Sequence, residues 1–143
     1  MATAVQRARI DAEPDASVDL HIAPEVRIRG FATEIDRALD NLLTNAVRYG
    51  RDAKTGRLHV TVSLTANADH ATVAVIDRGS GVFAAEIDRL LRPFERGETA
   101  RSGSTGAGLG LPIVDRIARM HAGLLRLLPN SPHGLRAEMT IAR

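Results

Sequence analysis

The sequence contains no cysteine, and this absence excludes two kinds of architecture. Without thiols the chain has neither a disulfide framework nor a thiolate metal site. Tryptophan is also missing, and the aromatic residues are one tyrosine and three phenylalanines. The core must therefore be built from alanine, valine, isoleucine and leucine. A chain of 143 residues with 44% hydrophobic content can supply such a core for one domain.

Strong charge of one sign is missing as well. Lys54 is the only lysine, so nearly all positive charge is carried by arginine, and the formal net charge is only +2. No basic stripe with interleaved aromatic residues is present, so nucleic acid is not an expected partner. No apolar run approaches the roughly 18 residues of a membrane span. Asp11, Glu13 and Asp15 interrupt the N-terminus, which argues against a signal peptide.

Hydrophobic periodicity predicts the elements. Alternation of apolar and polar residues predicts strands at 18–22, 26–29, 58–64, 71–76, 124–128 and 135–142. Turn-forming residues occupy 67–69 and 130–134. Apolar residues three and four apart predict helices at about 33–48, 84–91 and 111–121. Gly50 is expected to end the first helix in a left-handed conformation, and Pro112 to occupy the first turn of the last one.

This order of elements predicts the fold class. Hairpin connections dominate, so a doubly wound sheet is not expected. We predict an α/β (α+β) two-layer sandwich, in which a mixed, mostly antiparallel five-stranded sheet carries about three helices on one face. Residues 1–16 lack a period and are expected to form a mobile or edge segment, and residues 17–143 to form the domain.

The predicted helix at 33–48 has a polar flank as well as a core-facing side. The core-facing positions are Ile35, Leu39, Leu42, Leu43, Ala46 and Val47. Asn41 and Asn45 are four residues apart on the opposite flank, with Arg48 beside them. Amide oxygens suit Mg²⁺, and guanidinium groups suit phosphate oxygens. Taken alone, the same pattern also fits a solvated helix face.

A second stretch, Asp77-Arg78-Gly79-Ser80-Gly81, follows a predicted strand. A carboxylate at a strand end can accept a hydrogen bond from an exocyclic amine such as that of adenine. Glycines two apart let the backbone pass close to a flat ring. In isolation, however, an ordinary Asp-x-Gly turn would look the same.

A third stretch, residues 104–112, is rich in glycine and opens a predicted helix. Free N–H groups and the positive end of a helix can bind phosphate oxygens there, although a flexible linker has a similar composition. The stretch is not a P-loop, because no Gly-Lys-Ser/Thr follows. It is not a dinucleotide fingerprint, because no strand leads into it and the glycine spacing differs.

Together with Pro93-Phe94-Glu95-Arg96-Gly97, these stretches resemble the N, G1, F and G2 boxes of the sensor histidine kinase catalytic domain, in the GHKL ATPase superfamily. The resemblance covers about residues 26–141 and implies a Bergerat-type ATP-binding fold with an ATP lid at about 92–110. The arginine- and alanine-rich composition suggests a high-GC source, such as a mycobacterial sensor kinase.

The resemblance also implies roles for individual residues. Asn41, Asn45 and Arg48 would act in catalysis and contact the nucleotide, with Asn45 and Asn41 as Mg²⁺ ligands. Asp77 and its two glycines would bind adenine. The complete set of implied ATP-binding residues is Asn41, Asn45, Arg48, Tyr49, Asp77, Gly79, Gly81, Val82, Phe94, Arg96, Arg101, Thr105, Gly106, Gly108, Leu109, Gly110 and Leu111.

The partners implied are ATP, a histidine-containing dimerisation domain of the same kinase, and a response regulator. None of the five histidines is followed by an acidic residue, as the family's phosphoacceptor is, so we expect the acceptor outside this chain. We expect the isolated domain to be a monomer, and a cytoplasmic part of a membrane-anchored sensor kinase.

Two other interpretations are compatible with parts of the pattern. A relative that hydrolyses ATP or phosphorylates serine, of the chaperone, mismatch-repair or anti-sigma-factor type, carries a glutamate base four residues before the metal-binding asparagine. Asn41 holds that position here and cannot accept a proton, whereas a neutral imidazole acceptor needs no such base. A binding module without catalysis would have lost nucleotide contacts that this sequence retains.

Overall fold

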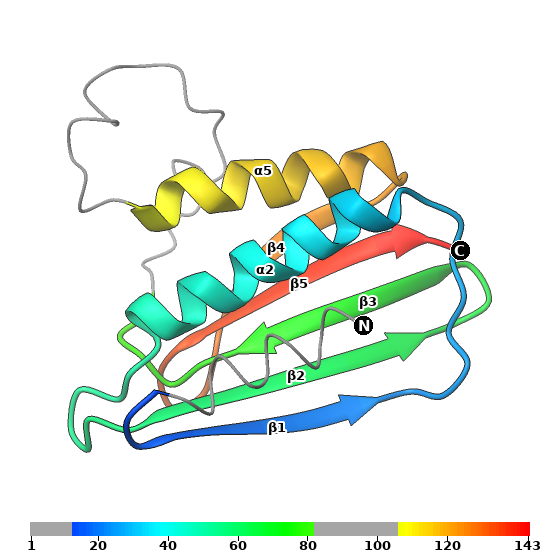
Figure 1. The fold of residues 1–143 in the computed structure, drawn as a ribbon. Coiled ribbons are helices and arrows are strands. Elements are labelled where there is room, and N and C mark those ends of the chain that lie inside the picture. The colour runs from blue at the N-terminus through cyan, green and yellow to red at the C-terminus, as the bar shows by residue number, and fades with distance from the viewer. Residues whose placement is uncertain (1–12, 82–105) are drawn as a thin grey trace.

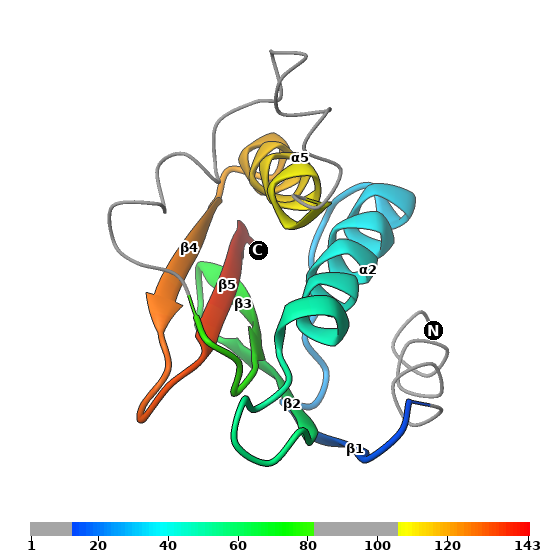
Figure 2. The same ribbon diagram turned by 90° about the vertical axis from the view of Figure 1, so that its left-hand side faces the viewer.

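The computed structural model describes residues 13–81 and 106–143. These residues form two helices, α2 (Ala32–Tyr49) and α5 (Gly106–Met120), and a five-stranded sheet. The strands are β1 (Ala16–Ile22), β2 (Leu58–Ala66), β3 (His70–Ile76), β4 (Leu124–Pro129) and β5 (Leu135–Ala142). Both helices lie on the same face of the sheet, as Figures 1 and 2 show. The two-layer α/β sandwich predicted from the sequence is therefore confirmed.

The sheet has the order β1-β2-β3-β5-β4. β1 pairs with β2 in parallel, and every other pair is antiparallel, so the mixed, mostly antiparallel sheet is also as predicted. One row of paired residues crosses all five strands. The row consists of Leu20, Val62, Val75, Ala137 and Leu127, which pack in or against the hydrophobic core.

The core between the layers is aliphatic, as the shortage of aromatic residues predicted. Helix α2 buries Ala38, Leu42, Leu43 and Ala46, and helix α5 buries Leu111, Val114, Ile117 and Ala118. Each large side chain of this kind stabilises the fold by about 1.5–3 kcal/mol when it is fully buried. Phe31 and Tyr49 are exposed. Neither α2 nor α5 is long and apolar enough to cross a membrane.

Two predicted elements differ from the observed ones. Residues 26–29 form no strand, because β1 already occupies the edge of the sheet beside β2; Val26 and Ile28 alternate because they pack against the core. Helix α5 begins at Gly106 rather than near residue 111, so Pro112 lies inside the helix and not in its first turn. Residues 106–110 of the predicted lid are therefore helical. The predicted helix at 84–91 lies outside the described residues.

The prediction for α2 is correct within one residue at each end, but the expected left-handed stop is wrong. Gly50 has a φ of −93°, so the backbone does not need glycine for its torsion angle. The glycine is required instead because there is no space for a side chain at this position. A Cβ on Gly50 would overlap the carbonyl oxygen of Ala46 and lie 2.7 Å from the Cβ of Asp77.

The two helices are joined at one end by His121, which is 7% exposed. Its Nε2 accepts a hydrogen bond from the backbone N–H of Phe31 at 3.0 Å, at the start of α2. Its Nδ1 donates to the carbonyl oxygen of Ile117 at 2.7 Å, within α5. Gly30 has no space for a side chain, because a Cβ there would overlap the imidazole. His121 thus fixes the start of α2 against the end of α5.

Candidate nucleotide site

The first part of the site is the segment after β3, residues 77–81, which we call the base loop. Asp77 is 6% exposed, and its Oδ1 accepts hydrogen bonds from the backbone N–H groups of Gly79 at 2.9 Å and Leu135 at 3.1 Å. Burial raises the pKa of the Asp77 carboxyl above its ordinary value, and the two hydrogen bonds partly offset this rise. Both bonds from the described residues go to Oδ1.

The glycines of the base loop are required by its neighbours in the fold. A Cβ on Gly79 would overlap the carbonyl oxygen of Tyr49 and lie 2.9 Å from the Cα of Gly50. Gly81 has a φ of +74°, which a side chain rarely adopts, and a Cβ there would lie 2.8 Å from the carbonyl oxygen of Gly134. The base loop is therefore seated on the end of α2 on one side and on the turn after β4 on the other.

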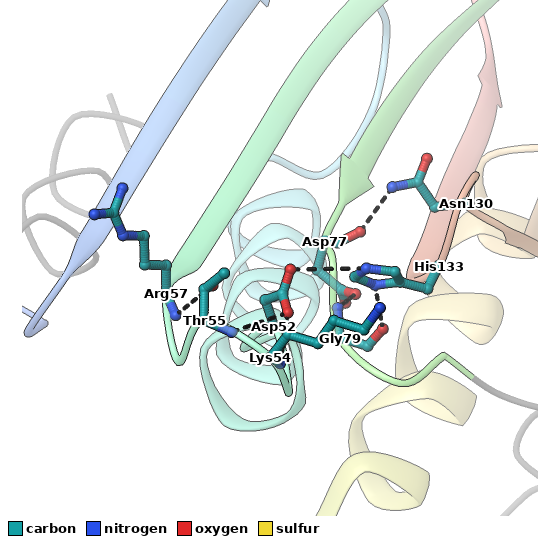
Figure 3. A network of polar contacts seen from close by, with 8 residues as sticks. All are labelled: Asp52, Lys54, Thr55, Arg57, Asp77, Gly79, Asn130 and His133. Carbon is teal, nitrogen blue, oxygen red and sulfur yellow. Dashed lines mark hydrogen bonds and ion pairs between the residues drawn. The ribbon is translucent and has the colours of Figure 1, made fainter.

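The turn between β4 and β5, residues 130–134, is a part of the site that the sequence indicated only as a turn. Asn130 donates from Nδ2 to the carbonyl oxygen of Asp77 at 2.9 Å, and Nδ1 of His133 lies 3.3 Å from the carbonyl oxygen of Gly79. Figure 3 shows both side chains directed at the base loop. The backbone N–H of Asp77 also donates to the carbonyl of Leu135 at 3.0 Å. These contacts join segments more than 50 positions apart, so no local signal predicts them.

The second part of the site is the polar flank of α2, where it meets the start of α5. A Cβ on Gly110 would lie 3.5 Å from Nδ2 of Asn45 and 3.6 Å from Cβ of Asn41. The structure thus brings both asparagines that the sequence singled out together with one of the glycines, Gly110. Asn45 is one helical turn, about 6 Å along the axis, from Tyr49 at the base loop.

One atom of the Asn45 amide lacks a partner among the described residues. Its Nδ2 is buried and forms no hydrogen bond within residues 13–81 and 106–143. An unsatisfied buried polar atom typically destabilises a protein by about 1–3 kcal/mol. A half-turn of the amide would place its carbonyl oxygen at the same point, so the group offers either a donor to phosphate or a ligand to a cation.

The chemistry of this flank fits a magnesium ion bound together with a phosphate chain. Nowhere in the described parts of the chain do three or more His, Asp or Glu side chains gather as a metal site. A cation here must therefore be held by amide oxygens and by the ligand's own oxygens, which is how Mg²⁺ is commonly bound beside nucleotides.

The other predicted site residues fall into three groups. Arg48 and Tyr49 are exposed at the end of α2, and Leu111 is 2% exposed and belongs to the core. Gly106, Gly108 and Leu109 lie in the first turns of α5. The remaining residues, Val82, Phe94, Arg96, Arg101 and Thr105, lie outside the described residues.

Comparison with known proteins gives concordant results. A family model described as histidine kinase-, DNA gyrase B-, and HSP90-like ATPase matches residues 30–143. The sensor-like histidine kinase SenX3 of Mycobacterium tuberculosis is 35% identical over 126 residues, which are 87% of this chain and 30% of SenX3. The sensor-type histidine kinase PrrB of M. tuberculosis is 36% identical over 121 residues, which are 85% of this chain and 25% of PrrB. The chain thus spans less than a third of these relatives.

Solved structures show the same fold. The mycobacterial sensor histidine kinase MprB superposes with a TM-score of 0.77 at 24% identity, covering 99% of this chain and 89% of that one. The catalytic domain of the histidine kinase ThkA superposes with a TM-score of 0.80 at 18% identity, covering 99% and 88%.

Proposed function

Because the chain belongs to the histidine kinase-, DNA gyrase B- and HSP90-like ATPase family, as an ATP-binding catalytic domain of the sensor histidine kinase type, we propose that it transfers the γ-phosphoryl group of ATP to a histidine side chain. The acceptor is on a separate dimerisation domain of the same kinase, and the phosphoryl group then passes to a response regulator. The working location is the cytoplasmic side of a membrane-anchored sensor.

The observation that carries this proposal is the amide flank of α2. Asn41 and Asn45 both lie against Gly110, and Nδ2 of Asn45 is buried without a partner among the described residues. Amides can bind a cation and phosphate oxygens but cannot remove a proton from water or from a hydroxyl group. The flank therefore favours positioning of the triphosphate for an acceptor that is already nucleophilic, as a neutral imidazole is.

Asn45 and Asn41 are the residues that would hold Mg²⁺, which when bound neutralises the charge that develops on the phosphate oxygens. Arg48, exposed at the end of α2, adds positive charge nearby. The ligand's base would lie at the base loop. There Oδ2 of Asp77 accepts a hydrogen bond from the amine of adenine, whereas guanine presents a carbonyl at that point and leaves the carboxylate unpaired.

A transfer assay tests this function. The domain is incubated with labelled Mg·ATP, alone and with the histidine-containing dimerisation domain of the same kinase. We expect acid-labile phosphohistidine on the added domain, none on the catalytic chain, and loss of the label when Asn45→Ala replaces the wild type. Release of inorganic phosphate without phosphohistidine would identify an ATP hydrolase, and phosphoserine a serine kinase; either result would refute the proposal.

A further inference from the structure

His133 lies between two groups that can only accept hydrogen bonds. Its Nδ1 is 3.3 Å from the carbonyl oxygen of Gly79 in the base loop. Its Nε2 is 3.7 Å from Oδ2 of Asp52, in the connection between α2 and β2. The first contact is a hydrogen bond when Nδ1 carries the proton, and the second is an ion pair when the ring is protonated. Figure 3 shows the ring between these two segments.

Asp52 is held in place by hydrogen bonds to the backbone of its own turn. Its Oδ1 accepts hydrogen bonds from the backbone N–H groups of Lys54 at 2.7 Å and Thr55 at 3.3 Å, and its own N–H donates to the carbonyl of Arg57. The N–H of Lys54 is the main cause that holds the pKa of Asp52 below its ordinary value, and the facing His133 contributes to the same effect. The carboxylate is therefore ionised and fixed in a tight turn.

The β4–β5 turn contacts the base loop through hydrogen bonds to two of its carbonyl groups. Asn130 already holds the carbonyl of Asp77 from the β4–β5 turn. The carbonyl of Gly79, two residues further along, contacts that turn only through His133 among the hydrogen bonds of the described residues. Removal of the imidazole would remove this hydrogen bond, while the packing of Gly79 on the end of α2 and the hydrogen bonds to Oδ1 of Asp77 would remain.

We propose that His133 is a positioning residue for nucleotide recognition, which links the carbonyl of Gly79 to the carboxylate of Asp52 and so holds the base loop at the distance that adenine requires. This inference rests on the proposed role of Asp77 in binding the base. It assigns a function to a side chain that contacts neither phosphate nor metal, and it makes the α2–β2 connection part of the specificity of the site.

Titration calorimetry with Mg·ATP and Mg·GTP tests the proposal, with thermal unfolding measured on the same samples. We expect His133→Ala to weaken ATP binding about fivefold to tenfold and to reduce the ATP/GTP preference. His133→Gln, which retains an N–H donor, should restore part of both. The matched control is His70→Ala, because His70 is an exposed histidine at the opposite end of β3; we expect wild-type affinity.

A double-mutant cycle identifies the partner. If His133 acts through the carboxylate, Asp52→Asn should weaken ATP binding, and His133→Ala should then have a smaller effect in that background than in the wild type. Unchanged ATP affinity and unchanged preference in His133→Ala would overturn the inference while leaving the proposed function intact. So would a loss that merely follows a lower melting temperature, or additive effects of the two substitutions. A wild-type chain that binds neither nucleotide would remove the proposed function itself, and the inference with it.

Discussion

The two ends of the site differ in how complete they are before a ligand arrives. At the base loop, the Asp77 carboxylate has two backbone donors, and the β4–β5 turn holds the loop from outside. At the junction of α2 and α5, Nδ2 of Asn45 is buried without a partner in the described structure. Under the proposed function, the base loop is the base end of the site and is preorganised, whereas this junction is the phosphate end and depends on the ligand to satisfy Asn45. Recognition of the base would then be a property of the fold, and recognition of the phosphates a property of the complex.

Both ends reduce the stability of the free domain, but for different reasons. Burial of Asp77 disfavours its charged form, which is why its pKa is raised. Nδ2 of Asn45 is buried and gains no hydrogen bond from the described residues. Truncation of Asn45, or a substitution of Asp77 that keeps an acceptor for Gly79 and Leu135, should therefore weaken nucleotide binding without weakening the fold. Substitutions in the surrounding framework should weaken both.

The largest effect is expected from Gly79→Ala. The new methyl group would overlap the carbonyl oxygen of Tyr49, so the base loop must leave the end of α2. Overpacking against backbone atoms should lower the free energy of unfolding by about 2–3 kcal/mol and abolish ATP binding. Urea denaturation and titration calorimetry measure the two effects. Retention of wild-type ATP affinity would show that the base end is not preorganised by this contact.

Asp77→Asn should separate binding from stability. The amide keeps an oxygen for the N–H groups of Gly79 and Leu135, but it turns a donor toward the amine of adenine. We expect ATP affinity to fall at least about tenfold, which corresponds to about 1.4 kcal/mol, and GTP to gain relative to ATP. An unaltered ATP/GTP ratio would contradict the assigned role.

The raised pKa of Asp77 gives the same variant a pH signature. Because its folded-state pKa is above the unfolded value, ionisation of Asp77 disfavours folding at neutral pH, and protonation on acidification removes that penalty. Asp77→Asn should therefore be at least as stable as the wild type at neutral pH, and the difference in favour of Asn should shrink in acid. Wild-type ATP affinity should begin to fall at a higher pH than an ordinary aspartate would cause. Denaturation and calorimetry across this pH range measure both trends.

Asn45→Ala should affect only the phosphate end. We expect about a tenfold loss of Mg·ATP affinity, because a neutral oxygen ligand of the ion is removed, while adenosine binds as it does to the wild type. Stability should be unchanged or slightly higher, since an unsatisfied polar atom is gone. Calorimetry with Mg·ATP, with ATP in a chelator, and with adenosine distinguishes the contributions of the ion, the phosphates and the base to binding. Equal weakening of adenosine would mean that the two ends are not independent.

The smallest effect is expected from Gly110→Ala. A Cβ here meets Asn45 and Asn41 at ordinary contact distances, so the fold should accept it. Alanine should stabilise α5 by about 0.5–1 kcal/mol relative to glycine. The methyl group would cover the Asn45 amide, so Mg·ATP affinity should fall a few-fold while adenosine affinity is unchanged. A destabilised variant would show that the start of α5 is packed more tightly than its contacts indicate.

Much of this arrangement could be predicted because its signals are local. The apolar positions of α2 recur with helical spacing, so its predicted bounds are correct within one residue. The strand at 58–64 alternates strictly, and the strand at 71–76 alternates more loosely. The start of α5 could not be predicted, because four of its first five residues are glycine or alanine and have no amphipathic pattern. Residues 26–29 alternate like a strand, but the edge beside β2 was already taken by β1.

The candidate site, like the fold, could be predicted from the sequence only where its signals are local. Asn41, Asn45 and Asp77 stand in short motifs whose chemistry is readable from residue type. The contacts of Asn130 and His133 were not readable, because they depend on how β4 and β5 return the chain to the base loop. Gly50 is an intermediate case: the sequence indicates that a glycine is needed there, but the reason is the space beside Ala46 and Asp77 and not the torsion angle.

The attachment of α2 to α5 through His121 has a mechanical consequence. The hydrogen bonds to Phe31 and Ile117 fasten the helices at the end remote from the proposed nucleotide site, so a change in the angle between the helices would pivot there. Gly110 is eleven residues away, or about 16 Å along the helix. A rotation of about 5° at this pivot would move Gly110 by about 1.4 Å relative to Asn45, which is enough to make or break a hydrogen bond. Such a rotation of α5 would open the proposed phosphate end, whereas the base loop, which is seated on the end of α2, would keep its contacts with Tyr49 and Gly50.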